Sequence, residues 1–212
     1  MQILTYNGFM TKLQIPRRTQ AERTRASREK ITRAATEFFA QQGFRGAKMA
    51  DIAKAADLTG PGLLHHFPSK THLLMEVIKE RDRIDSEWMR GVLQKNGNHF
   101  LEASIELVEH NETVPGLVQL FTLLVAEGIS KDHPAHEFFI QRYQREREHM
   151  IQAIMQAQQA NEVRSDIPAE TLVVLIFAMM DGLQVQWLLE PEKIDMSGVF
   201  RVLMDMLKVE DG

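Results

Sequence analysis

Short polar and basic side chains gather between Gly43 and Leu74, among apolar residues that recur at helical spacing. The stretch spells a short amphipathic helix, a tight turn, a second short helix and the capped start of a third. That is the layout of a helix-turn-helix, which lays its second helix in the major groove of DNA. Because the polar residues fall where a phosphate backbone would need them, the chemistry predicted here is binding to duplex DNA.

The turn and the second helix have the residue types that such a motif requires. Asp57 lies at the turn, and aspartate is one of the few residues besides glycine that tolerate the left-handed backbone of a tight turn. Thr59 suits the N-cap of the next helix, and Pro61 falls in its first turn, where a missing N–H costs little. Leu63 and Phe67, four residues apart, are expected to anchor this helix to the two before it.

The start of the following helix is a second candidate for phosphate binding. Ser69 suits its N-cap, and Lys70 is its first residue. A helix N-terminus presents free N–H groups and a partial positive charge, which together favour an anion. A capped helix start is common by itself, but the neighbouring His65 and His66 favour a phosphate contact here.

Helices must position these side chains, and the apolar spacing predicts where they lie. A first helix is expected from Ser27 to about Gln42, followed by helices near 49–56 and 60–66 and a long one from Ser69 to about Lys95. Apolar spacing and prolines predict further helices over 99–111, 114–129, 134–160, 168–190 and 195–208. The predicted fold class is therefore all-α, with about nine helices in a three-helix N-terminal domain and a C-terminal bundle.

The charge of the chain is divided unevenly along its length. Residues 1–74 carry 12 Lys and Arg against 5 Asp and Glu, whereas residues 75–212 carry 13 against 24. A basic first third on an acidic remainder favours a DNA-facing end and a body that avoids DNA. The chain has no cysteine, which excludes disulfides and thiolate metal sites and fits a reducing compartment, so a cytoplasmic protein is expected.

The ends of the chain and its most apolar run bear on targeting. Residues 1–24 have no clean apolar period and are predicted to form a flexible basic arm. Met1–Phe9 makes a poor signal peptide, and Met10 is a second candidate for the start. The run Leu172–Met180 is too short to span a bilayer, so no membrane contact is predicted.

The motif resembles the DNA-binding domain of the TetR family of bacterial transcriptional regulators. The matching residues are the Gly43-Phe44 start, the Asp51-Ile52-Ala53 core of the first motif helix and the Leu-x-His-His-Phe-x-Ser-Lys ending at Lys70. Asp181–Trp187 also resembles the penultimate helix of some members. The resemblance implies a homodimer whose two recognition helices enter successive major grooves of a palindromic operator, about 34–36 Å apart on B-DNA.

Carried over by position, the resemblance implies DNA contacts within residues 25–74, the expected DNA-binding domain, whose helix-turn-helix spans about 49–67. His66 and Lys70 would contact phosphates, and His65 would lie against the DNA backbone. Lys48 and Thr59, at the starts of the two motif helices, would face phosphates or groove edges. The positions that usually read bases are Gly60, Pro61, Gly62 and Leu64.

This sequence departs from the family pattern at Ala47, where members often have Thr or Ser, at Asp57, where Gly is common, and at Leu64, where Tyr is common. The Gly60-Pro61-Gly62 triplet offers no long polar side chain to pair with base edges. We therefore hypothesise that few side chains contact base edges directly. Specificity for the operator would come from Leu64 against a thymine methyl, from DNA shape and from basic side chains. Those basic side chains are Lys48, Arg17, Arg18, Arg23 and Arg25. The alternative is that the glycines only let the backbone approach the groove.

Residues 75–212 are expected to form a regulatory and dimerisation domain. By resemblance, the helices within 168–208 pair with their copies, although their apolar spacing also fits the core of one subunit. The family commonly binds a small molecule inside this bundle. Candidate lining residues, which equally suit ordinary core packing, are Trp88, Phe121, Phe138, Tyr143, Met150, Met155, Phe177, Met180, Gln184 and Trp187.

Catalytic motifs are missing from the sequence: it has no cysteine, no H-E-x-x-H and no glycine-rich phosphate loop after a strand. His133-x-x-His136 resembles a pair of metal ligands, but zinc needs further ligands placed by the fold, and no metal or cofactor is predicted. The expected function is a ligand-responsive repressor. An activator of the same fold, a helical hydrolase and a pure interaction protein are the alternatives.

Overall fold

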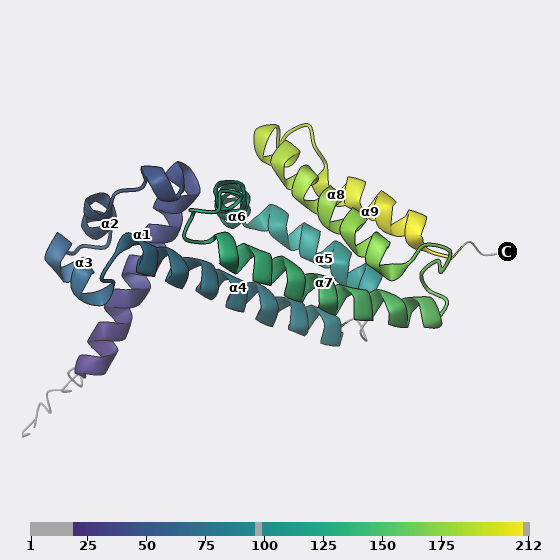
Figure 1. Ribbon diagram of the computed structural model, residues 1–212, viewed down its shortest axis with the longest axis horizontal. Helices are drawn as coiled ribbons and strands as arrows, with labels where there is room; N and C mark the ends of the chain where they lie inside the picture. Colours follow the sequence, from purple (N-terminus) through teal and green to yellow (C-terminus); the bar gives the residue numbers. More distant parts are fainter. Residues whose placement is uncertain (1–18, 96–98, 210–212) are drawn as a thin grey trace, which may run out of the picture.

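The computed structural model describes residues 19–95 and 99–209, and the helices within these ranges confirm the all-α prediction (Figure 1). Within them the elements run α1 (Gln20–Gly46), α2 (Met49–Ala55), α3 (Gly60–His66), α4 (Lys70–Lys95), α5 (Phe100–Thr113), α6 (Pro115–Gly128), α7 (His136–Gln159), α8 (Ala169–Leu189) and α9 (Met196–Leu207). The first 18 residues of the expected basic arm, with Met10, Arg17 and Arg18, lie outside the described residues.

Helix α1 begins earlier than predicted, so the assignment of residues 20–24 to a flexible arm was wrong. Thr19 is the N-cap: its side chain accepts a hydrogen bond from the Glu22 N–H at 3.2 Å, and the Glu22 carboxylate accepts one from the Thr19 N–H at 2.7 Å. This reciprocal capping box satisfies two N–H groups that a helix start otherwise leaves unpaired. Arg23 and Arg25, expected to act from an arm, therefore lie on the first turns of α1.

The motif helices pack on a core that they share with the body of the protein. Buried side chains of α1 and α3, such as Phe39 and Leu63, belong to one apolar cluster with Leu120 of α6 and Phe139 of α7. In Figure 1, α1 to α3 form the head at one end, and α4 runs from the head along α7. The head is therefore held against the body by packing as well as by the chain that joins them.

A second apolar cluster holds the far half of the body together. It contains Val108 of α5, Ile154 of α7, Leu172 and Trp187 of α8, and Phe200 of α9. Helices α8 and α9 lie side by side at the end away from the head (Figure 1). This cluster makes α8 and α9 part of the core of the chain while leaving one side of each helix uncovered.

Candidate nucleic-acid interface and effector region

The helix-turn-helix forms as the residue types predicted. Asp57 takes a φ of 60°, the left-handed value expected of the turn. The Thr59 side chain accepts a hydrogen bond from the Gly62 N–H at 3.2 Å and so caps α3, with Pro61 in the first helical turn. Leu63 is fully buried and packs α3 against the apolar core that it shares with α1 and α2. These local contacts hold α3 by its start and by one side, which leaves its other side to solvent.

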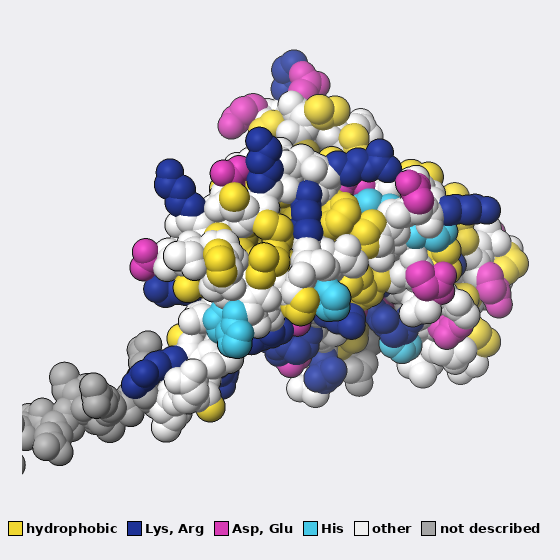
Figure 2. All heavy atoms as spheres, turned by 60° about the vertical axis from the view of Figure 1, so that its left-hand side comes forward, with side chains coloured by type: hydrophobic (Ala, Val, Ile, Leu, Met, Phe, Trp, Pro, Cys, Tyr) yellow, Lys and Arg dark blue, Asp and Glu magenta, His cyan; other side chains and the backbone are white. Residues whose placement is uncertain are grey.

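The outward side of α3 presents the residues that were predicted to meet DNA. Gly60, Pro61 and His65 are exposed, Leu64 is 49% exposed, and Gly62 and His66 are partly covered. Lys48 and Thr59, at the starts of the two motif helices, are exposed as well. Figure 2, in which the head comes forward, shows Lys, Arg and His side chains among small and apolar ones at this end. The small residues Gly60 and Pro61 leave this end of α3 exposed.

Arg28 of α1 positions the end of α3, a role that the sequence analysis missed. Its guanidinium donates to the His66 carbonyl at 3.1 Å and to the Glu76 carboxylate at 2.8 Å. The same group lies 4.3 Å from the ring centroid of Phe67. Partial burial, and after it the neighbouring His65 and Arg28, lower the pKa of His66, which favours the neutral form of its ring. A neutral imidazole binds a phosphate by a hydrogen bond rather than as an ion pair.

Lys70 lies at the start of α4, where Ser69 caps the helix by accepting from the His72 N–H at 3.3 Å. The Lys70 ammonium donates to the Arg45 carbonyl at 3.1 Å and lies 4.9 Å from the centroid of the Phe44 ring. Partial burial lowers its pKa. An ammonium has three donors, so this bond leaves two that can reach a phosphate.

A carboxylate of the body forms a hydrogen bond to the backbone of the head, at the joint where α1 meets α6. The Glu127 side chain, on α6, accepts a hydrogen bond from the Phe44 N–H at 2.7 Å, across 83 positions of sequence. The bond is possible because Gly43 takes a φ of 66° and a ψ of −179°, which turns the end of α1 toward α6. A Cβ at Gly43 would lie 2.5 Å from a Glu127 carboxylate oxygen. The joint therefore requires glycine at this position.

His133, in the loop before α7, lies next to Glu127 at the same joint. Its Nδ1 accepts from the Ala135 N–H at 3.2 Å, so Nε2 carries the proton and lies 3.7 Å from the Glu127 carboxylate. His136 Nδ1 instead pairs with the Gly128 carbonyl at 2.7 Å. The two histidines of the H-x-x-H spacing thus have separate partners, and no group of three metal-ligating side chains occurs in the described part of the chain.

Among the predicted effector-binding residues, Phe121 and Phe138 meet at a small cavity between α4, α6 and α7. Its volume is about 10 Å³, room for about one water molecule. Arg81 and Arg142 also line it, and their guanidinium carbons lie 4.5 and 4.7 Å from the centroid of the Phe121 ring. The two arginines were not predicted, because neither has a local sequence signature that would assign it to a site.

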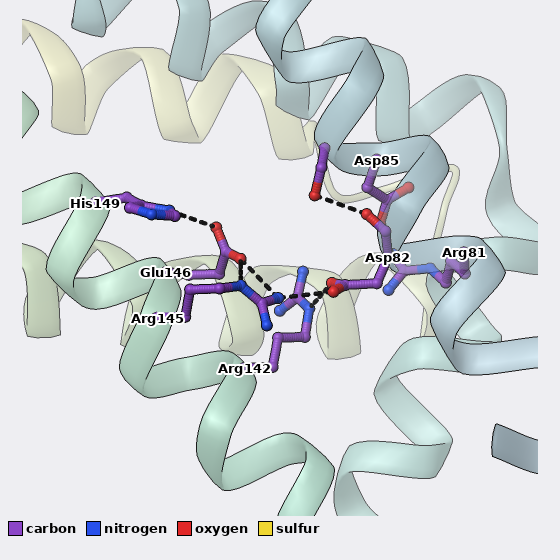
Figure 3. Close-up of polar contacts among 8 residues, drawn as sticks. Arg81, Asp82, Asp85, Arg142, Arg145, Glu146 and His149 are labelled. Atoms are coloured by element: carbon purple, nitrogen blue, oxygen red, sulfur yellow. Dashed lines mark hydrogen bonds and ion pairs between the residues drawn. The ribbon is translucent and has the colours of Figure 1, made fainter.

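Asp82 clamps α4 to α7 beside this cavity. Its carboxylate accepts from Arg142 at 2.7 Å and from Arg145 at 2.7 Å (Figure 3). One residue earlier on α4, Arg81 pairs with Asp85 at 3.1 Å. The helix that begins in the head is therefore tied to the body by charged groups at the cavity wall.

The other predicted effector-binding residues are not brought to that cavity. Tyr143 donates to the Asp181 carboxylate at 2.8 Å, and its ring lies 5.7 Å from that of Phe177. Burial raises the pKa of Asp181. Trp88 stacks on His110 with ring centroids 4.3 Å apart. The rest are divided between core and surface: Gln184 and Trp187 are buried, Met150 and Met180 pack partly buried on the second cluster, and Met155 is 40% exposed.

An open groove of about 350 Å³ lies between α1 and the start of α6. Thr36 and Ala40 line it on one side, and Pro115 and Leu117 on the other. None of the predicted effector-binding residues lies in it.

One side of α8 and α9 presents large apolar side chains to solvent. The exposed members are Val174, Leu175, Val185, Leu189, Val199, Val202 and Met206. On the opposite side of α8, Leu172, Ile176 and Leu183 are buried in the core of the chain. Helix α8 is also long and apolar enough to cross a membrane by length and composition, although about a third of its apolar window is buried within the protein.

A capped, outward-facing helix behind a tight turn, set on a helical body, defines a helix-turn-helix DNA-binding protein. The family model for bacterial regulatory proteins of the tetR family matches residues 31–77, and the model for the C-terminal domain of BetI-type transcriptional repressors matches residues 102–210. The chain belongs to the TetR family of transcriptional regulators. It is therefore a regulator and not an enzyme, and the family implies an operator and a small-molecule effector.

Similar proteins agree with this assignment. The HTH-type transcriptional regulator UidR of Escherichia coli (strain K12) is 28% identical over 151 residues, which is 70% of this chain and 74% of that protein. The regulator PksA of Bacillus subtilis (strain 168) is 27% identical over 195 residues, 87% of this chain and 91% of its own. A putative transcriptional regulator from Saccharomonospora viridis, solved in complex with choline, has the same fold. Its TM-score is 0.75 at 19% identity, over 87% of this chain and 98% of that one.

Proposed function

We propose that the protein is a cytoplasmic homodimeric repressor that binds a palindromic operator through α3 and is released by a small molecule bound in its C-terminal body. Residues 25–74 make the DNA-binding part and residues 75–212 the regulatory and dimerisation part. The observation that carries the proposal is that one chain exposes both a DNA-facing α3 and an apolar side of α8 and α9.

The exposed side of α8 and α9 supports the dimer. Leu175 is 52% exposed, Val202 59% and Met206 66%, and all three are large apolar side chains on the two C-terminal helices. Contiguous exposed apolar surface of this kind is typical of protein–protein interfaces. A second copy of the same helices would cover it symmetrically, as isologous dimers do.

Two heads are also what DNA binding requires. A single head offers few cationic contacts, since α3 itself carries no Lys or Arg, and few phosphate contacts give weak binding. We assign contacts with DNA phosphates to Lys48, Thr59, His66 and Lys70. His65 is assigned a position against the DNA backbone. Base contacts are left to Leu64 and to the Gly60–Gly62 backbone, so the operator should be specified partly by shape.

Helix α4 offers the mechanical link between effector and operator. It begins at Lys70 in the head and continues without a break past Arg81 and Asp82 at the cavity to Lys95. A ligand that moves α4 at the cavity would tilt the head and change the spacing of the two α3 helices. Such a ligand lowers DNA affinity only if it binds the displaced form more tightly than the DNA-bound form.

The test is selection of bound duplexes from a random DNA library with the purified protein, followed by binding assays at several salt concentrations. The expected result is an inverted repeat with half-sites one helical turn or a multiple apart, bound by a dimer with steep salt dependence. A monomer in solution, or an enriched site without two-fold symmetry, would contradict the proposal.

A further inference from the structure

The cavity between α4, α6 and α7 combines an aromatic wall with two cations. The Phe121 ring has the Arg81 guanidinium at 4.5 Å and the Arg142 guanidinium at 4.7 Å from its centroid. Phe138 and the aliphatic Leu124 complete the apolar part of the wall. A ring bound here would contact apolar side chains with guanidinium groups close by.

Arg81 has hydrogen-bonding capacity that the protein does not use. Its side chain is only 13% exposed, and its Nε finds no hydrogen-bond partner among the residues that the structure describes. Asp85 pairs with one terminal nitrogen of the same guanidinium at 3.1 Å. Burial lowers the pKa of Arg81 to about 10, which still leaves it a cation at neutral pH. A buried donor without an acceptor is costly, so an acceptor that entered the cavity would be favoured.

Asp82 shows which acceptor the cavity wall suits. Its carboxylate accepts a hydrogen bond from each of Arg142 and Arg145, both on α7, at 2.7 Å (Figure 3). Guanidinium groups bind carboxylates through paired N–H donors, with more geometric specificity than other cations. The fold therefore already holds one carboxylate at this wall, on the helix that leads to the DNA-binding head.

We propose that this cavity is the effector site, and that its effector is an organic acid in which a carboxylate is joined to an aromatic or similarly sized apolar ring. The ring packs on Phe121 and Phe138. The carboxylate bonds Arg81 Nε and competes with Asp82 for Arg142. This assignment rests on the proposed function and names the chemical class of its ligand.

The closed state of the cavity explains how such a ligand would act. A volume of about 10 Å³ is far smaller than a ring, so binding must part α4 from α6 and α7. Competition for Arg142 weakens the Asp82 clamp that holds α4 to α7. The ligand therefore binds an open form in which α4, and with it the head, is displaced. Differential affinity of that kind is what release from DNA requires.

The test compares acids with their own amides, so that only the charge changes. The probes are benzoate, 3-phenylpropanoate and 4-phenylbutanoate, the three matching primary amides, and choline as a cation. Affinities are measured by calorimetry on the DNA-free protein. At least one acid is expected to bind about 10-fold to 100-fold more tightly than its amide, as expected of hydrogen bonds to a charged group. Choline should bind more weakly than that acid.

Three variants separate the proposed role from a general loss of structure. Arg81→Lys keeps the charge but loses Nε, and should lower the acid-to-amide affinity ratio about tenfold. Asp82→Asn removes the competing carboxylate and should raise that ratio, an effect that partial unfolding cannot produce. The matched control is Glu80→Gln, which removes an exposed carboxylate of α4 that pairs with Arg83 instead, and should leave the ratio within about twofold.

The proposal is overturned if no acid binds more tightly than its amide, if choline binds more tightly than every acid, or if Asp82→Asn fails to raise the ratio. DNA binding by the ligand-free protein is measured separately. If the ligand-free protein did not bind DNA, the proposed function would be wrong. The acid-to-amide affinity ratios would still test the binding site.

Discussion

Replacing Gly43 by alanine is expected to destabilise the protein by about 3 kcal/mol, in two parts. The backbone at Gly43, with φ 66° and ψ −179°, lies in a region that side-chain-bearing residues avoid at a cost of about 1–3 kcal/mol. The added methyl would also lie 2.5 Å from a Glu127 oxygen. Moving that carboxylate weakens its bond to the Phe44 N–H, and a hydrogen bond to a charged group is worth about 1.5–3 kcal/mol.

Thermal unfolding followed by circular dichroism measures this effect. For a chain of this size, about 3 kcal/mol corresponds to a fall in Tm of roughly 6–12 °C. Gly91→Ala is the matched control, because Gly91 lies within α4 and a Cβ there would meet nothing within 4 Å. That substitution should stabilise the protein by about 0.5–1 kcal/mol. A Gly43→Ala protein as stable as the wild type would refute the account of the joint.

Three further outcomes follow from the site and the body. Lys70→Ala should weaken binding to all DNA sequences about equally and lower the slope of log affinity against log salt by about 0.9, because one phosphate is no longer neutralised; a change of preference at a single base pair, with the slope unchanged, would contradict that role. Leu175→Asp combined with Val202→Asp should convert the dimer into a folded monomer, seen by light scattering, and abolish tight operator binding; a stable dimer would show that the interface lies elsewhere. Burial raises the pKa of Asp181, so the folded state holds the carboxyl proton more tightly than the unfolded state does. The protein therefore loses stability as pH rises above about 4, the pKa of this carboxyl in the unfolded chain. Asp181→Asn should therefore raise Tm at pH 7, where its amide oxygen can still accept from Tyr143, and the gain should shrink toward pH 4; a gain that is constant across this range would refute the charge-based explanation.

Helix α4 gives the inferences a common physical basis. Its first turn lies at the head, where Ser69 caps it, and its middle lies against the cavity, where Asp82 holds α7. Sharp kinks in helices need a cause such as proline, an inserted water or a bulge, so we expect a shift at Asp82 to be carried to Lys70. The Glu127 bond to the Phe44 N–H and the apolar core shared by α1, α6 and α7 attach the head to the body as well.

The motif could be predicted because its determinants are local. Asp57 sets the turn through its own backbone tolerance, and Thr59 caps α3 through a bond to Gly62, three residues away. Apolar spacing and proline positions located most helices close to their observed ends. The error at the start of α1 was also local, since Thr19 and Glu22 carry the capping-box spacing that the prediction overlooked.

The helices, the motif and the family could thus be predicted from residue types and their spacing, because caps, turns and apolar periodicity act within a few residues. The pairing of distant groups depends on the packed fold: Glu127 meets Phe44 across 83 positions, and Asp82 meets Arg142 across 60. Charged residues on helix surfaces have no local signature of their partner, since the pairing depends on the angles and registers at which whole helices pack. For the same reason the scattered aromatic and methionine residues of the body could be named as candidates, whereas only the packed fold divided them between core, surface and cavity.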